Sequence, residues 1–317
     1  MSEPLSKTTR ILWAVDLFDS TDMRASEQFL QQLVDRAIAG NRVHGIKILP
    51  AIVVTPSELS DLSQERTAQK AATNWVRPER FPKDTLEQPV ILSASENHAT
   101  AFAEELYREA ERTEADLILV HSHSRSGISR WIKGSVAEEL SIESDIPILI
   151  LGKNFRMISN PDAHRVLFAT DFSENSLKAL RKLTPLLRLL RAQLHLYHGL
   201  TLESPLSSSV MSHAAMGSDT TGLATVSAAD PWQRMKILES LRNETIQEGV
   251  PCTYELDPKE GSLVDRVLQA AQRNQSSWIA LAGVSSKKEN QIWGSLSREL
   301  ARESALPTWL MHVESSL

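Results

Sequence analysis

The stretch at residues 134–147 reads GSVAEELSIESDIP, and the stretch at residues 294–307 reads GSLSRELARESALP. The Gly-Ser start, the Glu-Leu and Glu-Ser pairs and the final proline recur at one offset of 160 residues. Each stretch is typical of a helix that leads into a strand, because helical spacing is followed by proline and an apolar run. Self-similarity at one fixed offset indicates that the same structural unit occurs twice.

The strand that opens each unit recurs as well. Residues 10–16 read RILWAVD and residues 165–171 read RVLFATD, at an offset of 155 residues. We therefore interpret the chain as a tandem duplication, with one domain at residues 1–153 and the second at residues 161–317. Turn-forming residues at 154–163 form the expected linker between them.

The bulk composition excludes several classes of protein. Of the 317 residues, 41% are hydrophobic and 23% are charged, which is typical of a folded globular chain. The formal net charge of −6 disfavours binding to nucleic acid or to an anionic membrane, because such binding depends on clustered Lys and Arg. No apolar run approaches the roughly 20 residues that cross a bilayer. Cys252 is the only cysteine, so we expect no intrachain disulfide and a cytoplasmic location.

Short apolar runs alternate with longer stretches of helical periodicity in both units. This alternation predicts an α/β fold with two tandem doubly wound domains, each built on a five-stranded parallel sheet. The expected strands are 10–16, 43–54, 88–94, 116–121 and 146–151, and then 164–170, 192–198, 251–256, 277–282 and 307–313. The expected helices are 21–39, 57–75, 98–114 and 135–144, and then 174–190, 231–248, 261–274 and 295–305.

Residues 201–230 differ from the rest of the chain. They are rich in Ser, Ala, Thr, Gly and Met, they carry almost no charge, and they show no periodicity. Their position between a strand and a helix predicts a mobile surface loop. A tolerated insertion is the simpler interpretation, and a lid or partner-binding segment is the alternative.

Each unit carries polar and small residues where a nucleotide would bind. The first strand of each unit ends in aspartate, at Asp16 and Asp171, and the fourth strand leads to a helix that starts with Gly-Ser. Ligands of parallel α/β sheets bind beyond the carboxyl ends of the strands. Backbone N–H groups at a helix start can bind phosphate, and a carboxylate can accept a hydrogen bond from a base or sugar.

Five stretches of the chain resemble the universal stress protein family. Residues 170–174 (TDFSE) resemble the family's opening, and residues 192–198 (AQLHLYH) resemble its second strand. Residues 125–127 (RSG), 134–139 (GSVAEE) and 146–150 (IPILI) resemble its phosphate loop, fourth helix and fifth strand. The resemblance covers both units almost end to end. It implies the adenine-nucleotide alpha hydrolase-like fold of universal stress proteins.

The resemblance also implies where a nucleotide would bind. ATP-binding members carry Gly-x2-Gly-x9-Gly-Ser/Thr, and here the first two glycine positions hold His121 and Ser124 while Gly134 and Ser135 remain. A side chain at either of the first two positions would crowd the phosphates. In the first unit the candidate contacts to ATP or AMP are Asp16, Ala51, His121, Ser124, Arg125, Gly127, Gly134 and Ser135.

The second unit departs further from the family pattern. Its candidate contacts are Asp171, Gly294 and Ser295, but its phosphate loop is shorter and less glycine-rich. The family's adenine-side valine corresponds to Gly199, and Ala51 is the expected counterpart in the first unit. Alternatively, Gly294 and Ser295 only begin and cap a helix, as Gly134 and Ser135 would in the first unit.

The expected function is that of a non-catalytic stress-response protein with degenerate nucleotide sites, which senses a ligand or binds a protein. One alternative is a member that binds ATP or AMP in the first domain, and another is an adenylating or ATP-hydrolysing enzyme of related fold. No catalytic residue is assigned, because the sequence contains no Gly-x-Ser-x-Gly, His-Glu-x-x-His or P-loop motif. His121 and His123 supply only two of the roughly four ligands of a closed zinc site, so no metal is expected.

The resemblance finally implies how the two domains assemble. Universal stress proteins commonly dimerise through their fifth strands, and residues 146–150 and 306–311 are those strands here. Pairing them within one chain would cover two apolar sheet edges. We therefore expect an intramolecular pseudo-dimer with an approximate two-fold axis. An outer homodimer and a protein partner of unknown identity are left open.

Overall fold

The structure is a computed structural model. It describes residues 8–15, 20–39, 45–55, 80–121, 136–152, 154–155, 164–200, 231–284 and 295–313. The expected helix at 57–75 and the loop at 201–230 lie outside these residues.

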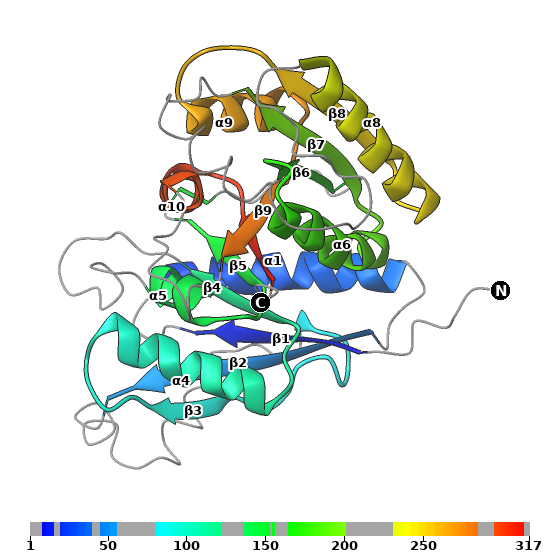
Figure 1. The fold of residues 1–317 in the computed structure, drawn as a ribbon. Coiled ribbons are helices and arrows are strands. Elements are labelled where there is room, and N and C mark those ends of the chain that lie inside the picture. Colours follow the sequence, from blue (N-terminus) through cyan, green and yellow to red (C-terminus); the bar gives the residue numbers. More distant parts are fainter. Residues whose placement is uncertain are drawn as a thin grey trace, which may run out of the picture.

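Strands and helices alternate along both halves, as the sequence predicts (Figure 1). The first half contains β1 (Thr9–Ala14), α1 (Ser20–Ala39), β2 (Ile46–Val54), β3 (Val90–Ser93), α4 (Ala99–Arg112), β4 (Leu117–His121), α5 (Val136–Glu143) and β5 (Ile148–Leu151). The second half contains β6 (Arg165–Ala169), α6 (Glu174–Leu189), β7 (Gln193–Gly199), α8 (Pro231–Gln247), β8 (Cys252–Asp257), α9 (Leu263–Arg273), β9 (Trp278–Val284), α10 (Ser295–Glu303) and β10 (Thr308–Val313). Within the described residues, no helix is both long and apolar enough to cross a bilayer.

All the strands join one ten-stranded sheet, in the order β3-β2-β1-β4-β5-β10-β9-β6-β7-β8. Pairing is parallel within each half, and only β5 and β10 pair antiparallel. In each half the first strand lies between the second and the fourth, so the chain reverses its winding direction there. Such a switch point opens a crevice at the carboxyl ends of the strands.

The expected pairing of the two fifth strands is present. Leu149 of β5 lies opposite Trp309 of β10, and these two residues are separated by the repeat offset of 160. A residue that pairs with its own repeat equivalent marks a local two-fold axis. Ion pairs between α10 and α5 add to the contact. The Arg298 guanidinium lies 2.9 Å from one carboxylate oxygen of Glu138, and the Arg302 guanidinium lies 3.6 Å from the other. We call this boundary between the halves the domain seam.

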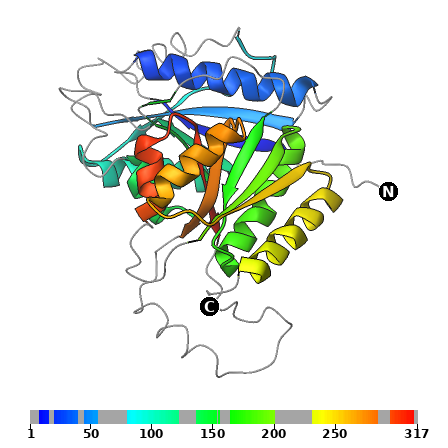
Figure 2. The ribbon, with the colours of Figure 1, turned by 90° about the horizontal axis from the view of Figure 1, so that it is seen from above.

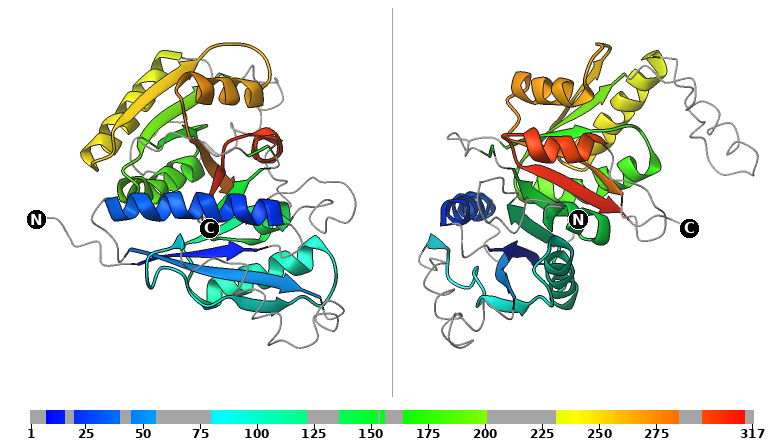
Figure 3. Two further views of the ribbon diagram at one scale, coloured as in Figure 1. Left: turned by 180° about the vertical axis from the view of Figure 1, so that it is seen from behind. Right: turned by 90° about the vertical axis from the view of Figure 1, so that its left-hand side faces the viewer.

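Helices cover both faces of the sheet, and alternate strand residues enter opposite cores. Trp13 and Phe168 pack on the face covered by α1, α6 and α8, whereas Leu12 and Leu167 pack on the face covered by α4, α5, α9 and α10. Both cores continue across the domain seam. Figure 2 shows α1 running along β1 and β2, and Figure 3 shows how strongly the sheet twists between its two ends.

The repeated Glu-Ser of the opening stretch makes the same turn in both halves. The Ser144 Oγ accepts a hydrogen bond from the Ile146 N–H at 3.0 Å, and the Ser304 Oγ accepts one from the Leu306 N–H at 2.9 Å. Both hydroxyls also donate to the carbonyl of the same residue. These bonds satisfy backbone groups in the turn before the fifth strand, which explains the serine without any ligand.

Ser144→Ala and Ser304→Ala should therefore lower the free energy of unfolding by similar amounts, about 1–2 kcal/mol each. Each change leaves a backbone N–H without its partner. Urea unfolding of the two variants and of Ser93→Ala, on the exposed end of β3, measures the effect. A loss in only one of the two repeat positions would contradict the equivalence of the turns.

Candidate functional site

Asp171 follows β6 and lies at the expected edge of the sheet, but it serves the local turn. Its carboxylate is exposed and its Oδ1 accepts a hydrogen bond from the Ser173 N–H at 3.0 Å. Ser173 in turn caps α6, because its Oγ accepts from the Ser176 N–H. The predicted carboxylate is thus available to solvent, and its described contact organises the start of α6.

The space beside Asp171 is filled by an aromatic stack. Phe172 has a φ angle of 64°, which is rare for a residue with a side chain, and its ring stacks on His198 at 4.2 Å. The His198 Nδ1 lies 2.7 Å from the Thr170 carbonyl oxygen. A carbonyl can only accept, so Nδ1 carries the hydrogen and Nε2 accepts from the Arg234 guanidinium at 2.8 Å.

This arrangement keeps the imidazole of His198 neutral. Burial lowers its pKa, and the adjacent Arg234 guanidinium acts in the same direction, against the hydrogen bond to Thr170. Arg234 itself is buried, at 8% exposure, although it comes from α8. A buried arginine therefore reaches the carboxyl ends of β6 and β7.

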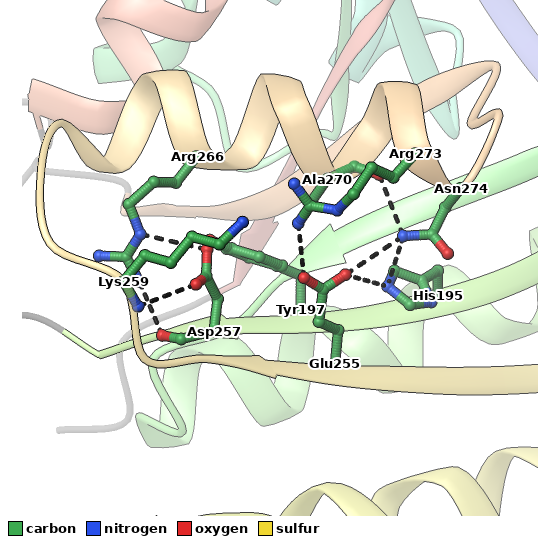
Figure 4. A network of polar contacts seen from close by, with 9 residues as sticks. All are labelled: His195, Tyr197, Glu255, Asp257, Lys259, Arg266, Ala270, Arg273 and Asn274. Atoms are coloured by element: carbon green, nitrogen blue, oxygen red, sulfur yellow. Dashed lines mark hydrogen bonds and ion pairs between the residues drawn. The ribbon is translucent and has the colours of Figure 1, made fainter.

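A second network closes the ends of β7 and β8 (Figure 4). The Arg266 guanidinium, from α9, donates to the Asp257 carboxylate at 3.2 Å, to the Asp257 carbonyl at 2.7 Å and to the Leu200 carbonyl at 2.8 Å. The Tyr197 hydroxyl donates to the same carboxylate at 2.7 Å. Arg266 and Asp257 are 5% and 2% exposed, so this ion pair is removed from water.

The network leaves little space at Gly199, the position of the family's adenine-side valine. A Cβ atom there would lie 2.6 Å from the Leu263 side chain, 2.9 Å from the Arg266 guanidinium and 3.3 Å from the Tyr197 hydroxyl. The first two distances are below ordinary van der Waals contact. The chain's own side chains therefore pack closely around Gly199 at this end of β7.

The sheet register changes the equivalence that was expected for the first half. The Val15 N–H donates to the Ala51 carbonyl, and the equivalent Thr170 N–H donates to the Tyr197 carbonyl. Ala51 is therefore level with Tyr197, and Val53 is level with Gly199. The first-half counterpart of Gly199 is therefore Val53, which is half-buried, and not Ala51, which is fully buried.

The strand ends of the two halves consequently differ in chemistry. Where the second half has Tyr197 and Asp257, the first has Ala51 and Leu92. Counted from the helix caps, Phe102 of α4 takes the place of Arg266. The first half thus presents an apolar edge where the second half carries a buried ionic network.

Most of the other predicted contacts lie outside the described residues. Those outside the described residues are Asp16, Ser124, Arg125, Gly127, Gly134, Ser135 and Gly294. Ser295 is the first residue of α10, as a helix start requires. His121 closes β4, is half-buried, and lies with its ring edge-on to Phe155 at 6.5 Å. Among the described residues, no group of three or more His, Cys, Asp or Glu side chains could hold a metal ion.

A hollow of about 670 Å³ lies at the other end of the second half, around the starts of β6, β7 and β8. His195, in its lining, contacts the Thr253 hydroxyl at 2.8 Å and the Asn274 side chain at 2.9 Å, and Figure 4 shows the second of these contacts. Cys252, also in the lining, is a buried thiol whose pKa is raised to about 12 by burial. Such a thiol is unreactive near neutral pH, because little of it is the thiolate.

Comparison with known proteins decides the family. The model of the universal stress protein family matches residues 7–152 and again residues 163–312. The chain belongs to the universal stress protein family. Residues of the two matches account for both halves of the sheet, so the tandem arrangement of universal stress protein domains is shown.

Individual relatives of this universal stress protein are distant. A universal stress protein from Archaeoglobus fulgidus DSM 4304 has a similar structure, with a TM-score of 0.60, 17% identity and 96% of each chain covered. A protein of unknown function from Pseudomonas aeruginosa PAO1 gives a TM-score of 0.55 and 12% identity, over 96% of this chain and 92% of that one. These likenesses show the fold alone.

One curated protein matches a short part of the chain. The stress response protein NhaX of Bacillus subtilis (strain 168) is 43% identical over 49 residues, which are 16% of this chain and 30% of that protein. The match spans less than a third of the relative's length, so it supports the family and carries no activity over.

Sequence reasoning missed three charged residues that are buried at the carboxyl ends of β6, β7 and β8, namely Arg234, Asp257 and Arg266. One signal was available, because Arg266 falls among the apolar residues of an amphipathic helix, between Val264 and Val267. A basic residue within an apolar stripe indicates a buried partner. The identity of that partner depends on how α9 lies against β8, which the sequence does not show.

Proposed function

We propose that this universal stress protein is a non-catalytic stress-response module, which senses a ligand or binds a protein, and whose nucleotide sites are degenerate. The observation that carries the proposal is the filled base side of the second cleft. Phe172 stacks on His198 there, and Leu263 and Arg266 lie close to Gly199, with the Arg266 guanidinium held by Asp257. A nucleotide base would have to displace a desolvated ion pair, which is costly because each charge would lose its partner.

A second candidate is an ATP- or AMP-binding member with its site in the first domain. The specific observation in its favour is the register of Val53 with Gly199, since the family's adenine-side residue is a valine. Ala51, Val53 and Leu92 are apolar, and an apolar edge suits the flat face of a base. His121 and Ser124, in place of two glycines, argue against it.

The remaining parts of the proposal concern location, assembly and chemistry. We propose a cytoplasmic protein whose structural units are residues 1–153 and 161–317, with the domain seam as its internal partner surface. An outer homodimer and an unidentified protein partner stay open. The enzymatic alternative, an adenylating or ATP-hydrolysing protein, has no observation in its favour among the described residues.

Calorimetric titration with ATP separates these functions. For degenerate sites we expect no saturable heat at ATP concentrations up to about 1 mM. A dissociation constant of about 1 mM corresponds to a binding free energy of only about −4 kcal/mol. If wild type binds, Asp16→Ala and its repeat equivalent Asp171→Ala form a matched pair. Loss of at least about tenfold in affinity for Asp16→Ala alone would establish the second candidate, because a hydrogen bond to a charged group contributes about 1.5–3 kcal/mol.

The same titration can overturn the proposal. Two binding events, or loss of binding in Asp171→Ala, would show that the second cleft opens for nucleotide. ATP turnover that disappears in Asp16→Ala would establish the enzymatic alternative. Native mass spectrometry of freshly purified protein checks that no nucleotide remains bound before the titration.

A further inference from the structure

Two buried histidines lie against the domain seam. His312 of β10 is fully buried, and neither ring nitrogen has a hydrogen-bond partner among the described residues. Its ring lies over Gly283, where a Cβ atom would approach the imidazole Cε1 to 2.7 Å. The charged groups that act on it come from both halves, Asp145 before β5 and Lys182 of α6. Lys182 also donates to the His312 carbonyl at 3.0 Å.

His164 lies beside an aromatic cluster formed by Phe29, Trp278 and Trp309. It precedes β6, is 6% exposed, and its ring is 4.9 Å from Trp278. The ring centroids of Trp278 and of Phe29, from α1, are 5.7 Å apart, so this cluster joins the first half to the second. The charged group that acts on His164 is Arg36, also from α1. Its Nδ1 lies 3.4 Å from the Ser277 hydroxyl, and its Nε2 has no partner among the described residues.

We propose that opening of the domain seam is driven by acid. In the closed seam His164 and His312 stay neutral, and when the two halves separate both rings bind protons. This inference does not rest on the function proposed above. It rests on the burial of both rings, on the Phe29–Trp278 contact that joins the halves beside His164, and on the three ring nitrogens that have no partner among the described residues. A buried imidazolium without a partner is costly. The open state would hydrate both rings and expose the paired edges of β5 and β10.

The electrostatics set the direction of the response. Burial lowers the pKa of His312 to about 4, with Lys182 acting in the same direction and Asp145 against it. Burial and the charge of Arg36 lower the pKa of His164 to about 4. The opened seam would return both rings to their ordinary pKa of about 6.5. Above that value neither state binds the proton, whereas between about 6.5 and 4 only the open state does, so opening is favoured as the pH falls.

The expected size follows from these two pKa values. Between pH 7 and pH 5, each histidine should raise the opening equilibrium constant about 20-fold, and the pair about 400-fold. The slope of its logarithm against pH should approach two protons per opening event. Hydrogen exchange with mass spectrometry, corrected for the intrinsic pH dependence of exchange, measures this constant for peptides that cover β5 and β10.

Three variants make the experiment specific. His164→Gln and His312→Gln should each reduce the slope to about one proton, and the double variant should make it nearly flat. His195→Gln is the matched control, because His195 is also buried, with a pKa lowered by burial, but lies at β7 away from the seam. It should leave the exchange of β5 and β10 as steep as in wild type.

The proposal is overturned if the double variant keeps the wild-type slope, or if His195→Gln flattens it. It is also overturned if β2 and β7 lose protection together with β5 and β10, since acid would then unfold the domains instead of opening the seam. If a glutamine variant does not fold, the slope of the wild-type protein alone decides. A slope below one proton would exclude acid-driven opening of the seam.

Discussion

Replacing Trp309 by alanine should lower the free energy of unfolding by about 3–5 kcal/mol, the range for removing a buried aromatic ring from a core. Trp309 is 2% exposed, lies opposite its repeat equivalent Leu149, and contacts Trp278 at 5.5 Å. A cavity at this position would reduce packing in the core of both halves at once. Chemical unfolding followed by circular dichroism measures the loss, and Trp309→Phe should cost clearly less because it leaves a smaller cavity.

Trp232→Ala is the matched control for this experiment. Trp232 of α8 is 62% exposed, and the Lys236 ammonium lies over its ring, 3.6 Å from the ring centroid. An exposed cation–π contact contributes about 0.5–1 kcal/mol, so this change should cost no more than that. Equal losses for Trp309→Ala and Trp232→Ala would show that the seam does not stabilise the fold.

Replacing Asp257 by alanine should also be strongly destabilising, by about 3–5 kcal/mol, because it leaves the Arg266 charge buried without its carboxylate. Burial alone would raise the pKa of Asp257, but the Lys259 N–H, the Tyr197 hydroxyl and the Arg266 guanidinium hold it below its ordinary value. The carboxylate is thus ionised at neutral pH. Equilibrium unfolding in urea at pH 7 measures the effect.

A double variant tests whether the loss comes from an isolated charge. Asp257→Leu with Arg266→Met removes both charges and keeps apolar volume, so it should recover a large part of the stability lost in Asp257→Ala. Lys178→Ala provides the control on a helix, since its i,i+4 ion pair with the exposed Glu174 carboxylate should contribute about 0.3–0.5 kcal/mol. If Asp257→Ala costs no more than Lys178→Ala, the Arg266–Asp257 pair does not hold the strand ends.

The order of elements could be predicted because the local signals agree with one another. The apolar run Leu117–Val120 predicts a strand covered on both faces, and it is buried in β4. The helix boundaries differ from the sequence prediction where a capping residue sets the first residue of the helix. Helix α9 was expected from residue 261 but begins at Leu263, because Ser262 is the N-cap and Gly261 has a φ angle of 113°.

The candidate site could be predicted only in part. Asp171 was expected as a nucleotide contact, and it does lie after β6, but its described partner is the Ser173 N–H. Pro50-Ala51 is the counterpart of Gly199 that the sequence suggests, whereas the ladder of hydrogen bonds shows that Val53 is level with Gly199. Register between strands depends on pairing partners far apart in the chain, which local patterns do not specify.

The sequence by itself determined the duplication and the α/β class, because these rest on periodicity and on recurring offsets. The family and the pairing of the fifth strands followed from its resemblance to universal stress proteins. Only the tertiary structure decided which side chains meet at the carboxyl ends of β6, β7 and β8. Arg234, Asp257 and Arg266 come from α8, β8 and α9, and their meeting is set by how these elements pack on β7. Charges far apart in sequence become partners only when burial brings them together, which is why the ligand question depends on packing.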